Sequence, residues 1–72
     1  MDLLANERYI IIKEMVQDKG AVTILELVNM LGGSKETIRR DLLLLEKENA
    51  LQRVYGGAVA INTTKEYPSL SK

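Results

Sequence analysis

Residues 23–42 read TILELVNMLGGSKETIRRDL and decide the fold. The stretch opens with Thr23 and Glu26 in the spacing of a capping box, in which a hydroxyl and a glutamate three residues later satisfy free amides at a helix start. Apolar residues then recur at i, i+3, i+4 and i+7 and predict a short helix over 24–31. A pair of glycines ends this helix, and a second polar-apolar pattern follows directly. The stretch therefore predicts two helices joined by a tight turn.

The segment after the glycines predicts a longer helix over 35–48. Ser34 is placed as its N-cap, where a hydroxyl accepts from first-turn amides. Asn49 is expected to stop the helix in the left-handed conformation that otherwise favours glycine. The stripe that we expect to face the core is Ile38, Leu42 and Leu45.

The flanking sequence supplies the remaining elements. Residues 3–18 have a helical apolar pattern, and Gly20 follows as a typical helix stop. Residues 21–23 read as a brief strand. Residues 51–61 read LQRVYGGAVAI, and they predict a β-hairpin whose two-residue turn is Gly56-Gly57 in a primed geometry.

The order of these elements predicts a mainly α fold with a small β-sheet (α+β). It is the order of a winged helix-turn-helix: three helices, a short strand and a C-terminal β-hairpin wing. We place this domain at residues 1–61 and interpret residues 62–72, rich in Ser, Thr and Lys, as a linker.

Composition excludes several classes of protein. The 72 residues include ten Lys and Arg, ten Asp and Glu, and neither His nor Cys. Imidazole or thiolate metal sites, disulfides and histidine catalysis are therefore excluded, and we expect no enzyme. The longest apolar runs, residues 42–45 among them, are far shorter than the roughly 20 residues of a membrane span. The sequence predicts a soluble cytoplasmic protein with no membrane contact, although its balanced charge does not itself indicate DNA.

The exposed side of the predicted 35–48 helix is the candidate site. Its N-terminal half offers cations, hydroxyls and one acid: Ser34, Lys35, Glu36, Thr37, Arg39 and Arg40. Such groups grip phosphates and read base edges, and Arg40 is the expected guanine reader. We expect Arg53 and the wing tip, Gly56-Gly57, to approach phosphate or the minor groove. The alternatives stay open: a solvated helix face of alternating charge, and a glycine pair that merely makes a turn.

The stretch SKETIRRDL at 34–42 resembles the recognition-helix signature of the DeoR family of bacterial transcription regulators. The resemblance covers about residues 7–60, from Arg8, Ile12 and Val16 at four-residue spacing to LQRVYGGA at 51–58. Three positions depart from the family pattern. Gly33 replaces the usual Val, which we expect to loosen the turn; Asn49 replaces Gly; and Tyr55 replaces the usual His in the wing, where it would alter the DNA contact.

The resemblance implies the DNA-binding domain of a regulator, usually a repressor of sugar or related carbon metabolism, whose partner is double-stranded operator DNA. It also implies an absent C-terminal domain that binds a phosphorylated sugar effector and forms a homo-oligomer, with no cofactor in the present domain. The runner-up interpretation is a winged-helix module for protein–protein contact without DNA binding.

Two further features call for structural interpretations. Asp41 and Arg8 both lie near inward faces of their helices, and we expect them to pair, or Arg8 to pair with another acid such as Glu26. Leu3, Ile10 and Leu43 point outward; they are either ordinary exposed residues or a contact with a sister subunit or the missing domain.

Overall fold

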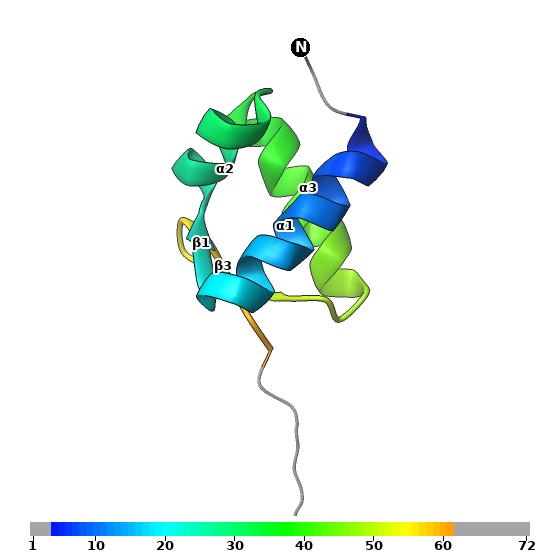
Figure 1. The fold of residues 1–72 in the computed structure, drawn as a ribbon, viewed down its shortest axis with the longest axis vertical. Coiled ribbons are helices and arrows are strands. Elements are labelled where there is room, and N and C mark those ends of the chain that lie inside the picture. The colour runs from blue at the N-terminus through cyan, green and yellow to red at the C-terminus, as the bar shows by residue number, and fades with distance from the viewer. Residues whose placement is uncertain (1–3, 62–72) are drawn as a thin grey trace, which may run out of the picture.

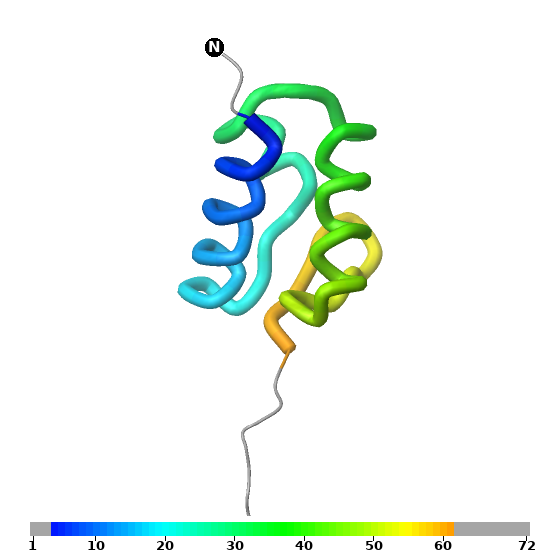
Figure 2. The backbone as a smooth tube through the Cα atoms, turned by 90° about the vertical axis from the view of Figure 1, so that its right-hand side faces the viewer, coloured from blue at the N-terminus to red at the C-terminus, as the bar shows by residue number. Residues whose placement is uncertain are grey.

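Three helices and three short strands follow one another within residues 4–61, the part of the chain that the computed structural model describes. Their order is α1 (Ala5–Lys19), β1 (Ala21–Thr23), α2 (Ile24–Leu31), α3 (Lys35–Lys47), β2 (Gln52–Val54) and β3 (Gly57–Val59). Figure 1 shows α1 lying across α3, with α2 and the strands to one side. Figure 2 shows α1 and α3 as two columns with β1 between them. The predicted winged helix-turn-helix arrangement is confirmed.

Local signals position α1 and the strand after it. The backbone N–H of Leu4 donates to Glu7 Oε1 (3.0 Å) at the helix start. Gly20 ends the helix with φ +85°, as predicted, and its N–H donates to the Val16 carbonyl (2.8 Å). The helix begins two residues later and ends one residue later than the predicted 3–18, while β1 matches the predicted strand. Leu3 and the predicted linker, 62–72, lie outside the described residues.

The helix-turn-helix segment forms as its sequence predicts. Thr23 Oγ1 accepts from the Glu26 N–H (3.0 Å) and Glu26 Oε1 accepts from the Thr23 N–H (2.9 Å), which completes the capping box. The two glycines that follow α2 have φ +80° and +81°, a region that a residue with a side chain adopts only under strain. Ser34 Oγ then accepts from the Thr37 N–H (3.2 Å) and starts α3. Asn49 has φ +62°, the predicted left-handed stop.

The sheet is antiparallel with strand order β1-β3-β2, so β2 is an edge strand. Val54 pairs with Gly57, which makes Tyr55 and Gly56 the two turn residues. The predicted Gly56-Gly57 turn is therefore wrong by one residue. Positive φ occurs at Gly56 and not at Tyr55, which is the pattern of a type II turn and not of a primed one.

Close packing of β3 against β1 explains this register. Gly57 is buried, and a Cβ at this position would lie 2.0 Å from the Val22 carbonyl oxygen and 3.0 Å from Thr23 Cα. A residue with a side chain could not occupy β3 here without moving β1. Gly57 is therefore required by a close backbone approach, and Gly56 by its left-handed φ.

The core lies between the three helices and the inner face of the sheet. It is aliphatic, as expected of a chain without Phe or Trp, and its buried members come from every helix, from β1 and β3, and from Leu51 just before β2: Ile12, Val16, Val22, Leu27, Leu31, Ile38, Leu42, Leu45, Leu51 and Ala58. The predicted inner stripe of α3 is confirmed.

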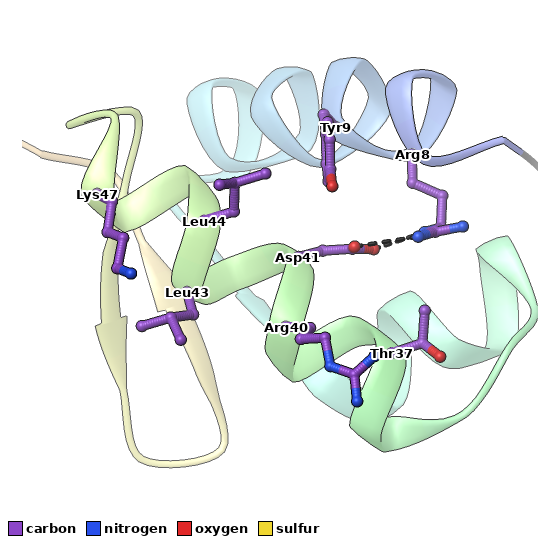
Figure 3. Close-up of a pocket in the computed structure, with 8 residues that line it drawn as sticks. All are labelled: Arg8, Tyr9, Thr37, Arg40, Asp41, Leu43, Leu44 and Lys47. Carbon is purple, nitrogen blue, oxygen red and sulfur yellow. Dashed lines mark hydrogen bonds and ion pairs between the residues drawn. The ribbon is translucent and has the colours of Figure 1, made fainter.

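One charged residue is buried with this core. Asp41 on α3 is 3% exposed, and its two carboxylate oxygens accept from Arg8 on α1, Oδ2 from Nε (2.5 Å) and Oδ1 from Nη2 (3.1 Å). Figure 3 shows this pair bridging the two helices. The predicted Arg8–Asp41 pair is confirmed, and the alternative partner Glu26 is wrong: Glu26 instead contacts Lys19 and caps α2.

The Arg8–Asp41 pair yields a test of stability. We expect Arg8→Met to lower the free energy of unfolding by about 3 kcal/mol, because it leaves a buried carboxylate without its partner. Asp41→Asn should cost less, since a neutral amide leaves no buried charge, and the double variant Arg8→Met/Asp41→Leu should recover part of the loss. Urea unfolding followed by circular dichroism measures all three. Losses below about 1 kcal/mol in both single variants would match a surface pair and contradict this role.

The glycine register yields a second test. Gly57→Ala should lower the free energy of unfolding by at least about 2 kcal/mol, because the new methyl group meets backbone atoms that cannot rotate away. Gly56→Ala is the matched control: nothing lies within 4 Å of its Cβ, so it carries only the left-handed cost of about 1 kcal/mol. Urea unfolding of the two variants should rank them in this order, and equal losses would refute the close-approach argument.

The cap of α2 yields a third test, by pH. A side-chain hydrogen bond from Lys19, together with the Thr23 backbone N–H, lowers the pKa of Glu26 in the folded chain. A lowered folded pKa means that the unfolded chain binds more protons, so this stabilisation is present above the unfolded value of about 4.3 and is lost as pH falls through the folded one.

Glu26→Gln keeps a capping side chain but removes the charge. Its melting temperature should therefore lie below that of the wild type at pH 7 and converge with it on acidification. Glu14→Gln is the control, at a glutamate with no side-chain hydrogen bond to another described residue. A wild-type-minus-variant difference that stays constant with pH, or matches the control, would rule out the Glu26 charge as the cause.

Candidate nucleic-acid interface

The N-terminal half of α3 presents the predicted polar set outward. Ile38, Asp41, Leu42 and Leu45 face the core, so the side chains about 100° to 160° away from that stripe must face out. Thr37 is half-buried beside the turn, and the other predicted residues of this half are all exposed: Ser34, Lys35, Glu36, Arg39 and Arg40. The structure therefore exposes five of the six predicted residues over the N-terminal half of α3, and Thr37 in part.

This surface is cationic. Lys35, Arg39 and Arg40 share it with one acid, Glu36. None of the three cations forms an ion pair with a residue between positions 4 and 61. The nearby carboxylate of Asp41 is already bound by Arg8 and does not compete for them. Free guanidinium groups on one helix turn can donate to phosphate oxygens or bidentately to guanine.

A groove lies between α1 and α3 beside this surface. It has a volume of about 360 Å³, and both helices supply its lining: Arg8, Tyr9, Thr37, Arg40, Asp41, Leu43, Leu44 and Lys47. Figure 3 shows Arg40 and Thr37 beside each other at one end of it and Lys47 at the other. Its carboxylate, Asp41, is paired with Arg8, so the groove offers no free acid–base pair for catalysis.

The wing places its predicted residues in three different settings. Tyr55 stands fully exposed at the tip beside the exposed Gly56, where both are available to a partner. Gly57 is buried in β3, so its part in the site is to fix the position of the tip. The Gly56 carbonyl accepts from the N–H of Ile24 (2.8 Å), which ties the tip to the start of α2.

Arg53, the remaining predicted wing residue, is exposed but contacts Glu46 on α3. Glu46 Oε2 accepts from the Arg53 backbone N–H and Oε1 from its Nε, each at 3.0 Å. These hydrogen bonds, the backbone one foremost, lower the pKa of Glu46. Sequence reasoning missed Glu46. The available signal was that an edge strand has outward N–H groups that need acceptors, and α3 immediately precedes β2.

The described residues form neither a metal site nor a membrane-spanning helix. Between positions 4 and 61, no three acidic residues come together in a way that could hold a metal ion. No helix in that range combines the length and the apolar character needed to cross a bilayer. The arrangement that does form, an exposed cationic helix flanked by a wing, is suited to the groove and backbone of a DNA duplex.

Comparison with known proteins agrees with this geometry. The sequence model described as "DeoR-like helix-turn-helix domain" matches residues 8–64. A relative in Bacillus subtilis (strain 168), the uncharacterized HTH-type transcriptional regulator FruR, is 37% identical over 68 residues, which are 94% of this chain and 27% of the relative. The HTH-type regulator YgbI of Escherichia coli (strain K12) is 44% identical over 63 residues, 88% of this chain and 25% of the relative.

A third relative is the lactose phosphotransferase system repressor of Staphylococcus aureus (strain NCTC 8325 / PS 47). It is 38% identical over 66 residues, 92% of this chain and 26% of the relative. The chain thus spans about a quarter of the length of the curated relatives it matches. No solved structure matches it significantly. The relatives are transcriptional regulators, so the helix-turn-helix domain that this chain shares with them is that of a regulator and not that of an enzyme. On these matches the earlier resemblance is confirmed, and the chain belongs to the family of DeoR-like helix-turn-helix domains.

Proposed function

We propose that this chain is the sequence-specific DNA-binding domain of a transcriptional repressor, with α3 in the major groove and the wing tip at the backbone or minor groove. The observation that carries the proposal is the exposed, unpaired state of Arg39 and Arg40 on α3 within the described chain. An α-helix fits the major groove, and arginine is the residue that most often reads guanine there.

The residues of α3 divide by their place on the helix. Ser34, Lys35 and Thr37 lie at its first turn, where free amides and a cation suit phosphate oxygens. Arg39 and Arg40 lie one turn further along and extend outward from the core, where base edges would stand. Arg40 is our proposed guanine reader, and Glu36 is able to accept from a cytosine amino group.

The wider biological role rests on the relatives. One of them is named a lactose phosphotransferase system repressor, which supports a repressor of sugar or related carbon metabolism acting in the cytoplasm. Because the chain spans about a quarter of such relatives, we propose that a phosphorylated sugar effector and homo-oligomer contacts belong to a separate C-terminal domain. Residues 1–61 would then form the DNA-binding domain, and 62–72 the linker to the effector domain.

A second candidate function is a protein–protein module. Apolar side chains exposed on α1 and α3, Ile10, Leu43 and Leu44, favour it. The unpaired cations of α3 favour DNA instead, because an apolar docking face has no need of them. Selection of duplexes from a random pool separates the two candidates, since only a DNA-binding domain enriches a sequence.

The proposed base reader gives the test. We expect Arg40→Ala to lose about 1–3 kcal/mol of discrimination between the enriched duplex and a scrambled one, because a bidentate guanine contact is removed. Lys13→Ala, which removes an equal charge from exposed α1, is the control and should keep that discrimination. Fluorescence anisotropy titrations of both duplexes over several salt concentrations provide the measurement.

Two results would count against these assignments. Full affinity and selectivity in Arg40→Ala would remove Arg40 as the base reader. Failure of the wild-type chain to enrich any duplex would overturn the DNA-binding proposal itself and leave the protein–protein module.

A further inference from the structure

The free edge of the wing is covered by one side chain of α3. β2 pairs only with β3 in the described sheet, and Arg53 lies one residue before the pair Val54–Gly57 that closes the turn. Residues alternate along an antiparallel ladder, so the Arg53 N–H points away from β3. Glu46 Oε2 accepts it at 3.0 Å. A helix side chain thus supplies the acceptor that a further strand would otherwise provide.

The same carboxylate fixes the side chain of that residue. Glu46 Oε1 accepts from Arg53 Nε at 3.0 Å, so one carboxylate holds the strand and the guanidinium together. The Arg53 and Glu46 side chains are 45% and 35% exposed, and such an ion pair adds little to folding stability. Its main physical effect is therefore to restrict the orientation of Arg53 and the distance between β2 and α3.

The restricted guanidinium retains its outer donors. Neither Nη atom of Arg53 donates to another residue in the 4–61 range. A guanidinium whose Nε is engaged can still offer its two Nη groups as a planar fork, which matches the paired oxygens of a phosphate. The tip of the wing is also held in place, because the Ile24 N–H donates a hydrogen bond to the Gly56 carbonyl. The fork therefore stands at a defined place relative to α3.

We propose that Glu46 is a positioning residue for DNA binding, which aims the Nη groups of Arg53 at a phosphate of the duplex whose major groove α3 occupies. The inference rests on the proposed function, and it names the backbone as the target because Arg53 lies in the strand and not at the tip. It assigns an acidic residue a favourable part in binding a polyanion.

This favourable effect of an acidic residue on DNA binding can be tested. Removing a negative charge near DNA should by itself tighten binding, whereas losing a positioning residue should weaken it. Glu46→Gln keeps the size of the side chain, but its amide has only one oxygen to accept from the two donors of Arg53, the backbone N–H and Nε. We expect about two- to tenfold weaker binding of the duplex enriched by the wild-type chain, the size of one lost hydrogen bond. We also expect a salt slope lower by up to about one unit.

Glu48→Gln is the matched control. It changes the net charge equally, two residues along, and its side chain forms no hydrogen bond within the described chain. It should bind the enriched duplex as tightly as the wild type or slightly more tightly. Equal effects of Glu46→Gln and Glu48→Gln, or tighter binding by Glu46→Gln, would overturn the inference.

Arg53 variants test the route of the effect without altering α3. Arg53→Lys keeps the charge but has no Nε–H to be oriented, so it should bind more weakly than the wild type, and Arg53→Gln, which also loses the charge, should bind more weakly still. Glu46→Gln should add no further loss in the Arg53→Gln background. Wild-type affinity in Arg53→Lys would overturn the positioning role. If the wild-type chain enriches a duplex and only Arg40→Ala, not the Glu46 or Arg53 variants, weakens its binding, the DNA-binding function stands and only this inference is rejected. If the wild-type chain enriches no duplex, both are rejected.

Discussion

The ion pair between Arg8 and Asp41, together with the aliphatic stripe beside it, sets which side of α3 faces outward. A carboxylate that is 3% exposed must be paired, and α1 provides the guanidinium that pairs it. With Asp41 turned inward beside the aliphatic stripe of α3, the 100° step per residue leaves Arg39 and Arg40 on the opposite side. A different rotation of α3 would bury a guanidinium and expose a leucine. The cationic surface is thus a geometric consequence of the inward face that Asp41 shares with Ile38, Leu42 and Leu45.

Much of the fold could be predicted because its signals are local. Thr23, Ser34, Gly20 and Asn49 each cap or stop a helix through their own side chain or φ, and the structure confirms all four. The same holds for the outward set on α3, which follows from helical spacing alone. The partner of Arg8 was predictable only as a choice between two acids, because spacing gives the face of a helix but not the neighbour that packs against it.

The errors lie where tertiary contacts decide. Two adjacent glycines allow two hairpin registers, and the backbone of β1 selects the one in which Gly57 passes Val22. The contact of Glu46 with Arg53 depends on how closely α3 approaches the edge of the sheet, which no short sequence pattern encodes. The contacts of Arg40, Arg53 and Tyr55 with DNA stay predictions, since they concern a molecule that is not in the structure.

The hydrogen bond from Ile24 to Gly56 has a consequence for how tightly a duplex could be held. Many loops lose conformational freedom when they bind a ligand, and this entropic cost makes the binding free energy less favourable. This hairpin has strands of three residues, and its tip is fastened to the first residue of α2 before any ligand arrives. The backbone of the tip therefore has little freedom to lose, and the entropic cost of a contact by Tyr55 comes mainly from its exposed side chain. The same hydrogen bond fixes where the wing tip lies, so a ligand must bind within reach of the Tyr55 ring.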